Sequence, residues 1–205
     1  FKRGWRTATG DAPLRENLAA GILKLAGWTP DQPLLDPMCG SGTFLLEAAQ
    51  IALDIAPGLG RRFGFGRFRH LDRPAWAGVR KAAEARRQAP RALPIFGSDI
   101  VGEQLRRTRT NLEAAGLADC VSLERADLLE RVPPAAGGVM VSNPPYGVRI
   151  GEAEALAAFY PRLGDALKQR WSGWRCFFFS GDPALPKRIG LKASRRTPLF
   201  NGALE

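Results

Sequence analysis

Residues 34–44 of this 205-residue chain read Leu-Leu-Asp-Pro-Met-Cys-Gly-Ser-Gly-Thr-Phe, and the other segments can be arranged around them. The segment begins as a short apolar strand, stops at Asp36, and passes through a turn that contains Gly40 and Gly42. An apolar helix follows, over residues 41–55. Glycine has no Cβ, so a ligand can approach the backbone of such a turn closely. The first N–H groups of the helix also have no partner within it. We therefore expect a ligand site between this strand and this helix.

A second apolar strand, residues 139–142, stops at Asn143 and is followed by Pro144, Pro145 and Tyr146. The first segment lacks both the glycine spacing of dinucleotide-binding turns and the Gly-Lys ending of a P-loop. A carboxylate at a strand end beside a very short glycine turn suits a zwitterionic ligand without phosphates, and S-adenosylmethionine fits that description. Together the two segments resemble the motifs of class I S-adenosylmethionine-dependent methyltransferases that act on an exocyclic amine.

Short apolar segments alternate with helical ones along the chain, which predicts an α/β fold with a mainly parallel sheet and helices on both faces. The predicted strands are residues 33–36, 93–98, 120–123, 139–142 and 174–180. The resemblance implies the Rossmann-like, seven-stranded sheet of class I methyltransferases. The hairpin signal Asn201-Gly202 predicts one antiparallel edge, whose last strand is cut short by the end of the chain.

Helical periodicity predicts the first helix of the chain. Leu14, Leu18, Ile22 and Leu25 recur at helical spacing, so we expect that face to pack on the sheet. Asp11 is the expected N-cap, with Pro13 near the first helical position. The remaining predicted helices include residues 76–88, 101–115, 152–171 and 183–189.

Polar side chains end four of the predicted strands: Asp36, Asp99, Asp127 and Asn143. Ligands of such sheets bind outside the carboxyl ends of the strands, where the strand order reverses. Asp99 can accept both hydroxyls of a ribose, or it can cap the helix that follows it. Asp127 can bind the adenine amino group, with the next backbone N–H at a ring nitrogen, although nearby Glu124 competes for this role. Asp36 is expected to orient the glycine turn and to reach the ammonium group of the ligand.

The resulting set of cofactor contacts covers most of the two segments and their neighbours. It consists of Asp36, Pro37, Cys39, Gly40, Gly42, Thr43, Asp99, Ile100, Asp127, Leu128 and Asn143. Cys39, Cys120 and Cys176 lack zinc-ligand spacing, so we expect buried thiols and no metal site.

The catalytic residues are predicted to be Asn143, Pro144, Pro145 and Tyr146. A conjugated exocyclic amine is a poor nucleophile. Two acceptors, the Asn143 side-chain oxygen and the Pro144 carbonyl, can hold its hydrogens and stabilise the positive charge that develops on it. Prolines fix the backbone, and Tyr146 offers a face on which a base can stack. His70, the single histidine, is not expected to take part.

The net charge of +10 and the pI of about 10.4 favour a polyanionic partner, most simply nucleic acid. A solvated basic surface is the alternative. Residues 57–70, rich in glycine, arginine and phenylalanine, can stack on bases and bind phosphates, or serve as a connector whose aromatics cap a helix. The candidate RNA contacts are Arg61, Arg62, Arg67, Arg69, Arg80, Lys81, Arg86, Arg87, Lys187, Arg188, Arg195 and Arg196.

The resemblance extends over nearly the whole chain. The segments 2–6, 12–20, 36–43, 56–58, 97–99, 143–147 and 201–205 resemble the catalytic domain of THUMP-associated RNA guanine-N2 methyltransferases. It implies a single catalytic domain over residues 1–205, with residues 1–30 as an extension and helix, residues 31–205 as the α/β core, and no THUMP domain in this sequence. It also implies that Pro13, Glu16 and Asn17 line the pocket.

The implied activity is methyl transfer to the N2 amine of a guanine in RNA, most simply 23S ribosomal RNA. Three alternatives remain: a tRNA guanine-N2 enzyme, another amine methyltransferase acting on adenine N6 or a protein glutamine, and a non-catalytic RNA-binding module. The chain begins at Phe1 without a charged-then-apolar leader and has no apolar run of membrane-spanning length. We therefore expect a fragment of a longer cytoplasmic protein.

Overall fold

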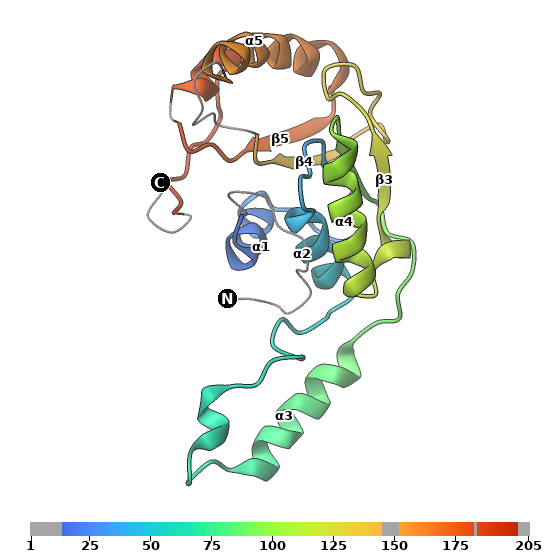
Figure 1. The fold of residues 1–205 in the computed structure, drawn as a ribbon, viewed down its shortest axis with the longest axis vertical. Coiled ribbons are helices and arrows are strands. Elements are labelled where there is room, and N and C mark those ends of the chain that lie inside the picture. Colours follow the sequence, from blue (N-terminus) through green and yellow to red (C-terminus); the bar gives the residue numbers. More distant parts are fainter. Residues whose placement is uncertain (1–13, 145–151, 183, 201–205) are drawn as a thin grey trace.

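The computed structural model describes residues 14–144, 152–182 and 184–200. Its sheet has five strands in the order β3-β2-β1-β4-β5 (Figure 1). They are β1 (Leu34–Asp36), β2 (Ile95–Asp99), β3 (Ser122–Arg125), β4 (Gly138–Ser142) and β5 (Trp174–Phe178). Every neighbouring pair is parallel. The predicted α/β class with a parallel sheet is therefore confirmed.

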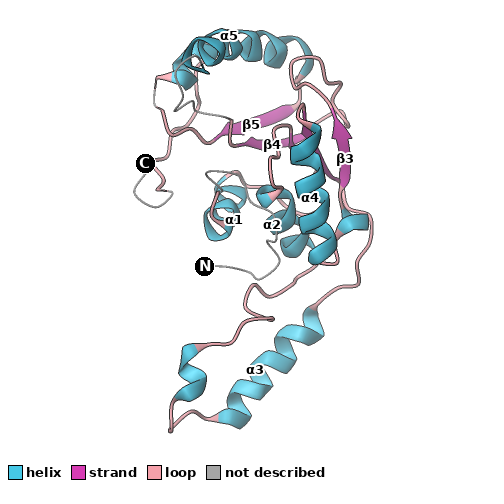
Figure 2. Ribbon diagram, viewed as in Figure 1, coloured by secondary structure: helices cyan, strands magenta, loops and turns pink. Residues whose placement is uncertain are grey.

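Helices cover the two faces of the sheet (Figure 2). The α-helices are α1 (Glu16–Leu25), α2 (Thr43–Ala52), α3 (Arg73–Arg86), α4 (Gly102–Ala114) and α5 (Glu152–Arg170). Three short 3-10 helices are η1 (Gly64–Arg67), η2 (Ala118–Cys120) and η3 (Leu185–Ile189). Of the described helices, none is long and apolar enough to span a membrane.

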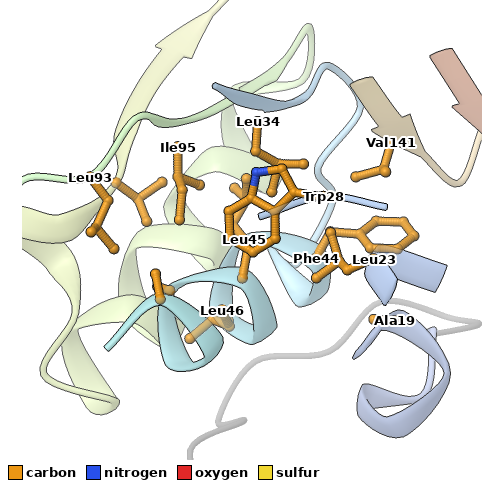
Figure 3. Close-up of a cluster of buried hydrophobic side chains, with 14 of the residues drawn as sticks. Ala19, Leu23, Trp28, Leu34, Phe44, Leu45, Leu46, Leu93, Ile95 and Val141 are labelled. Atoms are coloured by element: carbon orange, nitrogen blue, oxygen red, sulfur yellow. The ribbon is translucent and has the colours of Figure 1, made fainter. Parts of the chain in front are cut away.

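Buried side chains form one cluster on each face of the sheet because successive strand residues point to opposite faces. Leu34, Ile95 and Val141, from three strands, lie with Leu45 of α2 in the first cluster (Figure 3). The other cluster takes the next residue of β1, Leu35, together with residues of α5. Strands buried on both faces explain why these segments read as continuous apolar runs.

The seven strands that the resemblance implies are not confirmed, because the described residues hold five strands and residues 191–200 contain none. The turn predicted at residues 201–202 lies outside the described residues. The first helix begins at Glu16, and its N-cap is Arg15 instead of the predicted Asp11. Leu25 is exposed, and Leu23 is buried in its place.

Between α2 and β2 the chain leaves the core as an extended arm, residues 57–91, which carries η1 and α3 (Figure 1). Helix α3 starts three residues earlier than predicted because Asp72 caps it, accepting the Ala75 N–H at 2.9 Å. Phe63 and Phe65 stack on each other and meet the Trp76 ring edge-on. These two aromatics therefore pack on the first turn of α3, which favours the connector, one of the two roles expected for this segment.

Candidate active site at the strand ends

The strand order brings the predicted polar strand ends together. β1 is central, the chain passes from it to β2 on one side, and it later returns to β4 on the other. This reversal of direction is the position at which open α/β sheets bind ligands. Asp36 and Asp99 end β1 and β2, and Asn143 directly follows β4. The three therefore lie at the same edge of three adjacent strands.

The turn between β1 and α2 requires its glycines. Gly40 and Gly42 have φ values of +54° and +81°, in the left-handed region that favours glycine. A Cβ on Gly42 would lie 2.7 Å from Cγ2 of Thr108, too close for a methyl contact. The Cys39 N–H donates to the carbonyl of Ser98 at 2.9 Å, which continues the pairing of β1 with β2 into the turn.

Asp99 connects the end of β2 to this turn. One carboxylate oxygen accepts the Gly40 N–H at 3.0 Å, and the other accepts the Val101 N–H at 2.9 Å. Asp99 is not the cap of α4, whose N-cap is Val101. An ionised carboxylate has about four acceptor positions, so the two backbone bonds leave capacity for a further donor on each oxygen.

Helix α4 supplies two residues of the site that the sequence reasoning missed. Thr108 donates its hydroxyl hydrogen to the carbonyl of Gly40 at 2.8 Å, and the Asn111 amide donates to the carbonyl of Ser41 at 3.0 Å. Both side chains are fully buried. Their spacing of three places them on the same helix face as the apolar Leu112. Polar residues on the apolar face of a helix need hydrogen-bond partners, and this pattern could have identified the two residues from the sequence.

Asp36 is buried beneath the turn. Its Oδ1 accepts the Met38 N–H at 3.3 Å and the hydroxyl of Ser142 at 3.2 Å. Burial, with a smaller contribution from the nearby charge of Asp99, raises the pKa of Asp36 to about 8, although the two hydrogen bonds act to lower it. Asp36 thus links β1 to the end of β4 and to the Met38 N–H of the turn.

The remaining predicted contacts occupy varied positions. Asp127 is partly exposed and accepts the Leu129 N–H at 2.9 Å in a local turn. Its suggested competitor, Glu124, is paired with Arg131 at 3.2 Å. Ile100 is largely exposed. Pro37, Cys39, Thr43 and Leu128 are buried.

Asn143 carries an unusual group. Its side-chain oxygen is buried, and no donor among the described residues reaches it, although the residue as a whole is partly exposed. Ser142 fixes the backbone just before it by accepting the Phe179 N–H at 2.9 Å. Buried acceptors are almost always satisfied in folded proteins, so an unpaired oxygen at this edge is suited to a ligand donor. Pro144 is buried beside it.

Three predicted residues, Pro13, Pro145 and Tyr146, lie outside the described residues. His70 is exposed and lies in the arm, between η1 and α3. The described part of the site therefore consists of the glycine turn, the carboxylates of Asp36 and Asp99, the two α4 side chains and Asn143.

Residues 3–205 match the family model described as RMKL-like, methyltransferase domain. A Synechocystis sp. protein, slr0064, provisionally named an RNA methyltransferase, is 46% identical over 204 residues, or 99% of this chain and 53% of that protein. The ribosomal RNA large subunit methyltransferase K/L of Shewanella baltica is 43% identical over 209 residues, or 100% of this chain and 30% of that protein.

A solved structure is similar over the same length. The crystal structure of SMU.472, provisionally named a methyltransferase and complexed with SAH, has a TM-score of 0.90 and 37% identity. The match covers 99% of this chain and 53% of that one. The chain thus spans about half the length of slr0064 and SMU.472, and less than a third of the K/L protein.

Proposed function

The chain belongs to the RMKL-like methyltransferase domain family, and from this premise we propose that it transfers a methyl group from S-adenosylmethionine to the exocyclic N2 amine of a guanine in RNA. Large-subunit ribosomal RNA is the proposed substrate. The activity is that of the whole protein to which the chain belongs, because the relatives are about twice its length or longer. The proposed location is the cytoplasm.

The proposed methyl donor is supported by the fit of the strand-end residues. The SAH-bound relative shares the fold at a TM-score of 0.90. The free acceptor positions of Asp99 suit two ribose hydroxyls, and Asp127 at the end of the adjacent strand suits an adenine amino group. The glycine turn lets an amino-acid moiety approach the backbone, and Asp36 below it would neutralise an ammonium group once it has lost its proton. S-adenosylmethionine supplies a sulfonium methyl group that an amine can displace.

The unpaired oxygen of Asn143 carries the proposal. An acceptor that is buried without a donor costs about 1–3 kcal/mol, and an incoming N–H from a base amine removes that cost. With the Pro144 carbonyl as a second acceptor, both hydrogens of the amine are held, and its lone pair is directed at the methyl group. Both acceptors also stabilise the positive charge on the nitrogen as the N–C bond forms.

No strong base is needed in this scheme. The amine becomes cationic as it takes the methyl group, and it then readily releases a proton to water. The contribution of the protein is to position the two reactants in line. Pro145 and Tyr146, which follow directly in the sequence, are proposed to stiffen the segment and to stack on the target base.

RNA is the proposed substrate class on two grounds. The chain has a net charge of +10, which suits a polyanion. Two of the most similar relatives carry RNA or ribosomal RNA in their names. The Asn-Pro acceptors would hold an adenine N6 amine equally well, so the choice of guanine rests on the family resemblance and is tested by the product.

Asn143→Ala in the whole protein is the test of the mechanism. We expect methyl transfer to RNA to fall by about 10²–10³-fold, the usual effect of removing one group that stabilises developing charge. Affinities for S-adenosylhomocysteine and for RNA should stay within a few-fold of the wild type, because the deleted oxygen serves the amine. Unchanged turnover in the variant would overturn the assignment of Asn143.

A further inference from the structure

Most of the chain's excess positive charge lies in one segment. Residues 57–91 contain ten Arg and Lys residues but only two acidic ones, Asp72 and Glu84, a net charge of +8 out of +10 for the whole chain. The ten are Arg61, Arg62, Arg67, Arg69, Arg73, Arg80, Lys81, Arg86, Arg87 and Arg91, and all of them are exposed. The remaining 170 residues are nearly neutral by comparison.

This segment is the arm, which stands away from the sheet and its helices (Figure 1, Figure 2). No residue of α3 or η1 is buried. The arm is held at its base by an ion pair between Arg86 and Asp54 at 3.2 Å. The Gln88 N–H also donates to the backbone carbonyl of Leu53 at 2.9 Å. A hollow of about 250 Å³, lined in part by Gln50 and Arg87, lies beside this base. The arm therefore contributes almost nothing to the core.

The arm nevertheless has a defined shape. Phe63, Phe65 and Trp76 form its small aromatic centre, with ring centroids 4.9–5.4 Å apart. Asp72 caps α3, and the Arg61 guanidinium lies 5.4 Å from the Phe63 ring. A structured element that buries no core surface and concentrates charge is expected to serve a binding role.

The charges on α3 are regularly spaced. Arg73 and Arg80 in α3 and Arg87 at its C-cap recur every seven residues, which returns to the same face of a helix after two turns. At 1.5 Å of rise per residue the three lie about 10 Å apart along the axis. They form a straight basic stripe, a form that suits the repeating phosphates of a nucleic acid backbone.

The arm is far from the strand-end site. Helix α2 starts at the glycine turn and ends near the base of the arm, a length of about 15 Å for its ten residues. The 14 residues of α3 add about 21 Å more. Figure 1 shows α3 pointing away from the sheet. Contacts made by the outer part of the arm are therefore remote from the reacting base.

We propose that residues 57–91 are an RNA-docking arm, which binds the phosphate backbone of the substrate at a segment remote from the target nucleotide. This inference rests on the proposed function for the identity of the RNA. The proposed docking role requires a folded RNA that is long enough to reach from the strand ends to the arm. Exposed large apolar side chains on the arm are few, chiefly Phe68 and Val79. The arm therefore favours a charged partner, RNA, over a partner that binds by burying apolar surface.

The test is a triple variant of the stripe, Arg73→Gln, Arg80→Gln and Arg87→Gln, in the whole protein. Glutamine keeps the helix propensity close to that of arginine. A control variant removes the same charge from the core surface, at the exposed residues Lys24, Arg162 and Lys192. Binding to ribosomal RNA and to a short stem-loop that carries the target nucleotide is measured as a function of salt concentration.

For the stripe variant we expect a loss of tenfold or more in affinity for the long RNA at low salt, and a decrease of about two in the slope of log K against log salt. Affinity for the short stem-loop should change less than threefold, and so should the long-RNA affinity of the control. Equal losses in the two variants, or an unchanged salt slope in the stripe variant, would overturn the proposal.

The two proposals can fail separately. RNA binding is measured without the methyl donor, so it reports on the arm even if no guanine is methylated. If guanine is methylated, the stripe variant should raise the half-saturating concentration of long RNA, with turnover at saturation within about twofold. A loss of turnover at saturating RNA instead would show that the arm acts on the reaction itself and contradict a docking role.

Discussion

The carboxylate of Asp99 accepts the backbone N–H of Gly40 at 3.0 Å, which links two residues 59 positions apart in the sequence. The end of β2 and the turn after β1 are therefore one unit. The same carboxylate that we expect to bind a ribose also shapes the turn that approaches the rest of the ligand. Substitution of Asp99 should affect both functions.

Asp99→Ala should reduce the affinity for S-adenosylhomocysteine by at least tenfold, because hydrogen bonds to a charged group are worth about 1.5–3 kcal/mol each. Titration calorimetry of the folded variant measures this loss. Asp119→Ala is the control, since Asp119 is an exposed aspartate in η2. Equal affinities of Asp99→Ala and the control would remove Asp99 from the site.

Thr108→Val replaces the hydroxyl that donates to the Gly40 carbonyl with a methyl group of similar size. We expect a loss of about 1–3 kcal/mol in the free energy of unfolding, since a buried acceptor is left without its donor. Urea denaturation measures it. The neighbouring exposed Thr110 provides the matched Thr110→Val control, which should stay within about 0.5 kcal/mol. A neutral Thr108→Val would show that the turn does not depend on α4.

Gly42→Ala should destabilise the protein by about 1–3 kcal/mol, since alanine is strained at the φ of +81°. Its Cβ would also overlap Cγ2 of Thr108. Gly21→Ala in α1 is the control, because it meets no atom within 4 Å and should be neutral or stabilising. Adding Thr108→Ser removes Cγ2, so the cost of Gly42→Ala should be smaller in that background. Simple additivity would contradict the close contact.

The buried Asp36 predicts a pH dependence. Its pKa of about 8 in the folded protein lies above the ordinary value of 3.8, so the native state keeps a proton that the unfolded state loses between these values. The stability contribution is complete below about pH 4 and falls as the pH rises toward 8. Asp36→Asn keeps the acceptor for Met38 and Ser142 but cannot ionise.

The difference in unfolding free energy between wild type and Asp36→Asn, followed from pH 5 to pH 8, is the relevant measurement. Stability of the wild type should fall relative to the variant across that range. Parallel curves would contradict the raised pKa. If Asp36 neutralises a ligand ammonium group, binding by the wild type should also strengthen with pH, and the variant should lose that trend.

The strand ends were predictable because each apolar run and the polar residue that ends it are neighbours in the sequence. The strands were placed to within a few residues, and the parallel sheet followed from their alternation with helices. Asp36, Asp99 and Asn143 were thereby brought to one edge correctly. Leu25 was misplaced because helical spacing alone fits two neighbouring faces. Helix α1 packs mainly against α2 and not on the sheet as expected, and this contact selected Leu23.

Long-range side-chain contacts were not predictable in the same way. The bonds from Thr108 and Asn111 to the glycine turn depend on how α4 lies against α2, which no local pattern specifies. The partner of Asp36 was likewise missed, since Ser142 lies 106 residues away. The arm was seen in the sequence as a basic, glycine-rich loop and a helix. The sequence did not show that the arm stands away from the core, a position in which α3 has no buried residue.

The most direct measurement is the identity of the methylated nucleoside formed in RNA. Ribosomal RNA that lacks the modification is incubated with labelled S-adenosylmethionine and the whole protein, either wild type or Asn143→Ala, and then digested to nucleosides. The account predicts N2-methylguanosine with the wild type and a hundredfold less or lower with the variant. Label on adenine N6, or equal labelling by the two proteins, would contradict it.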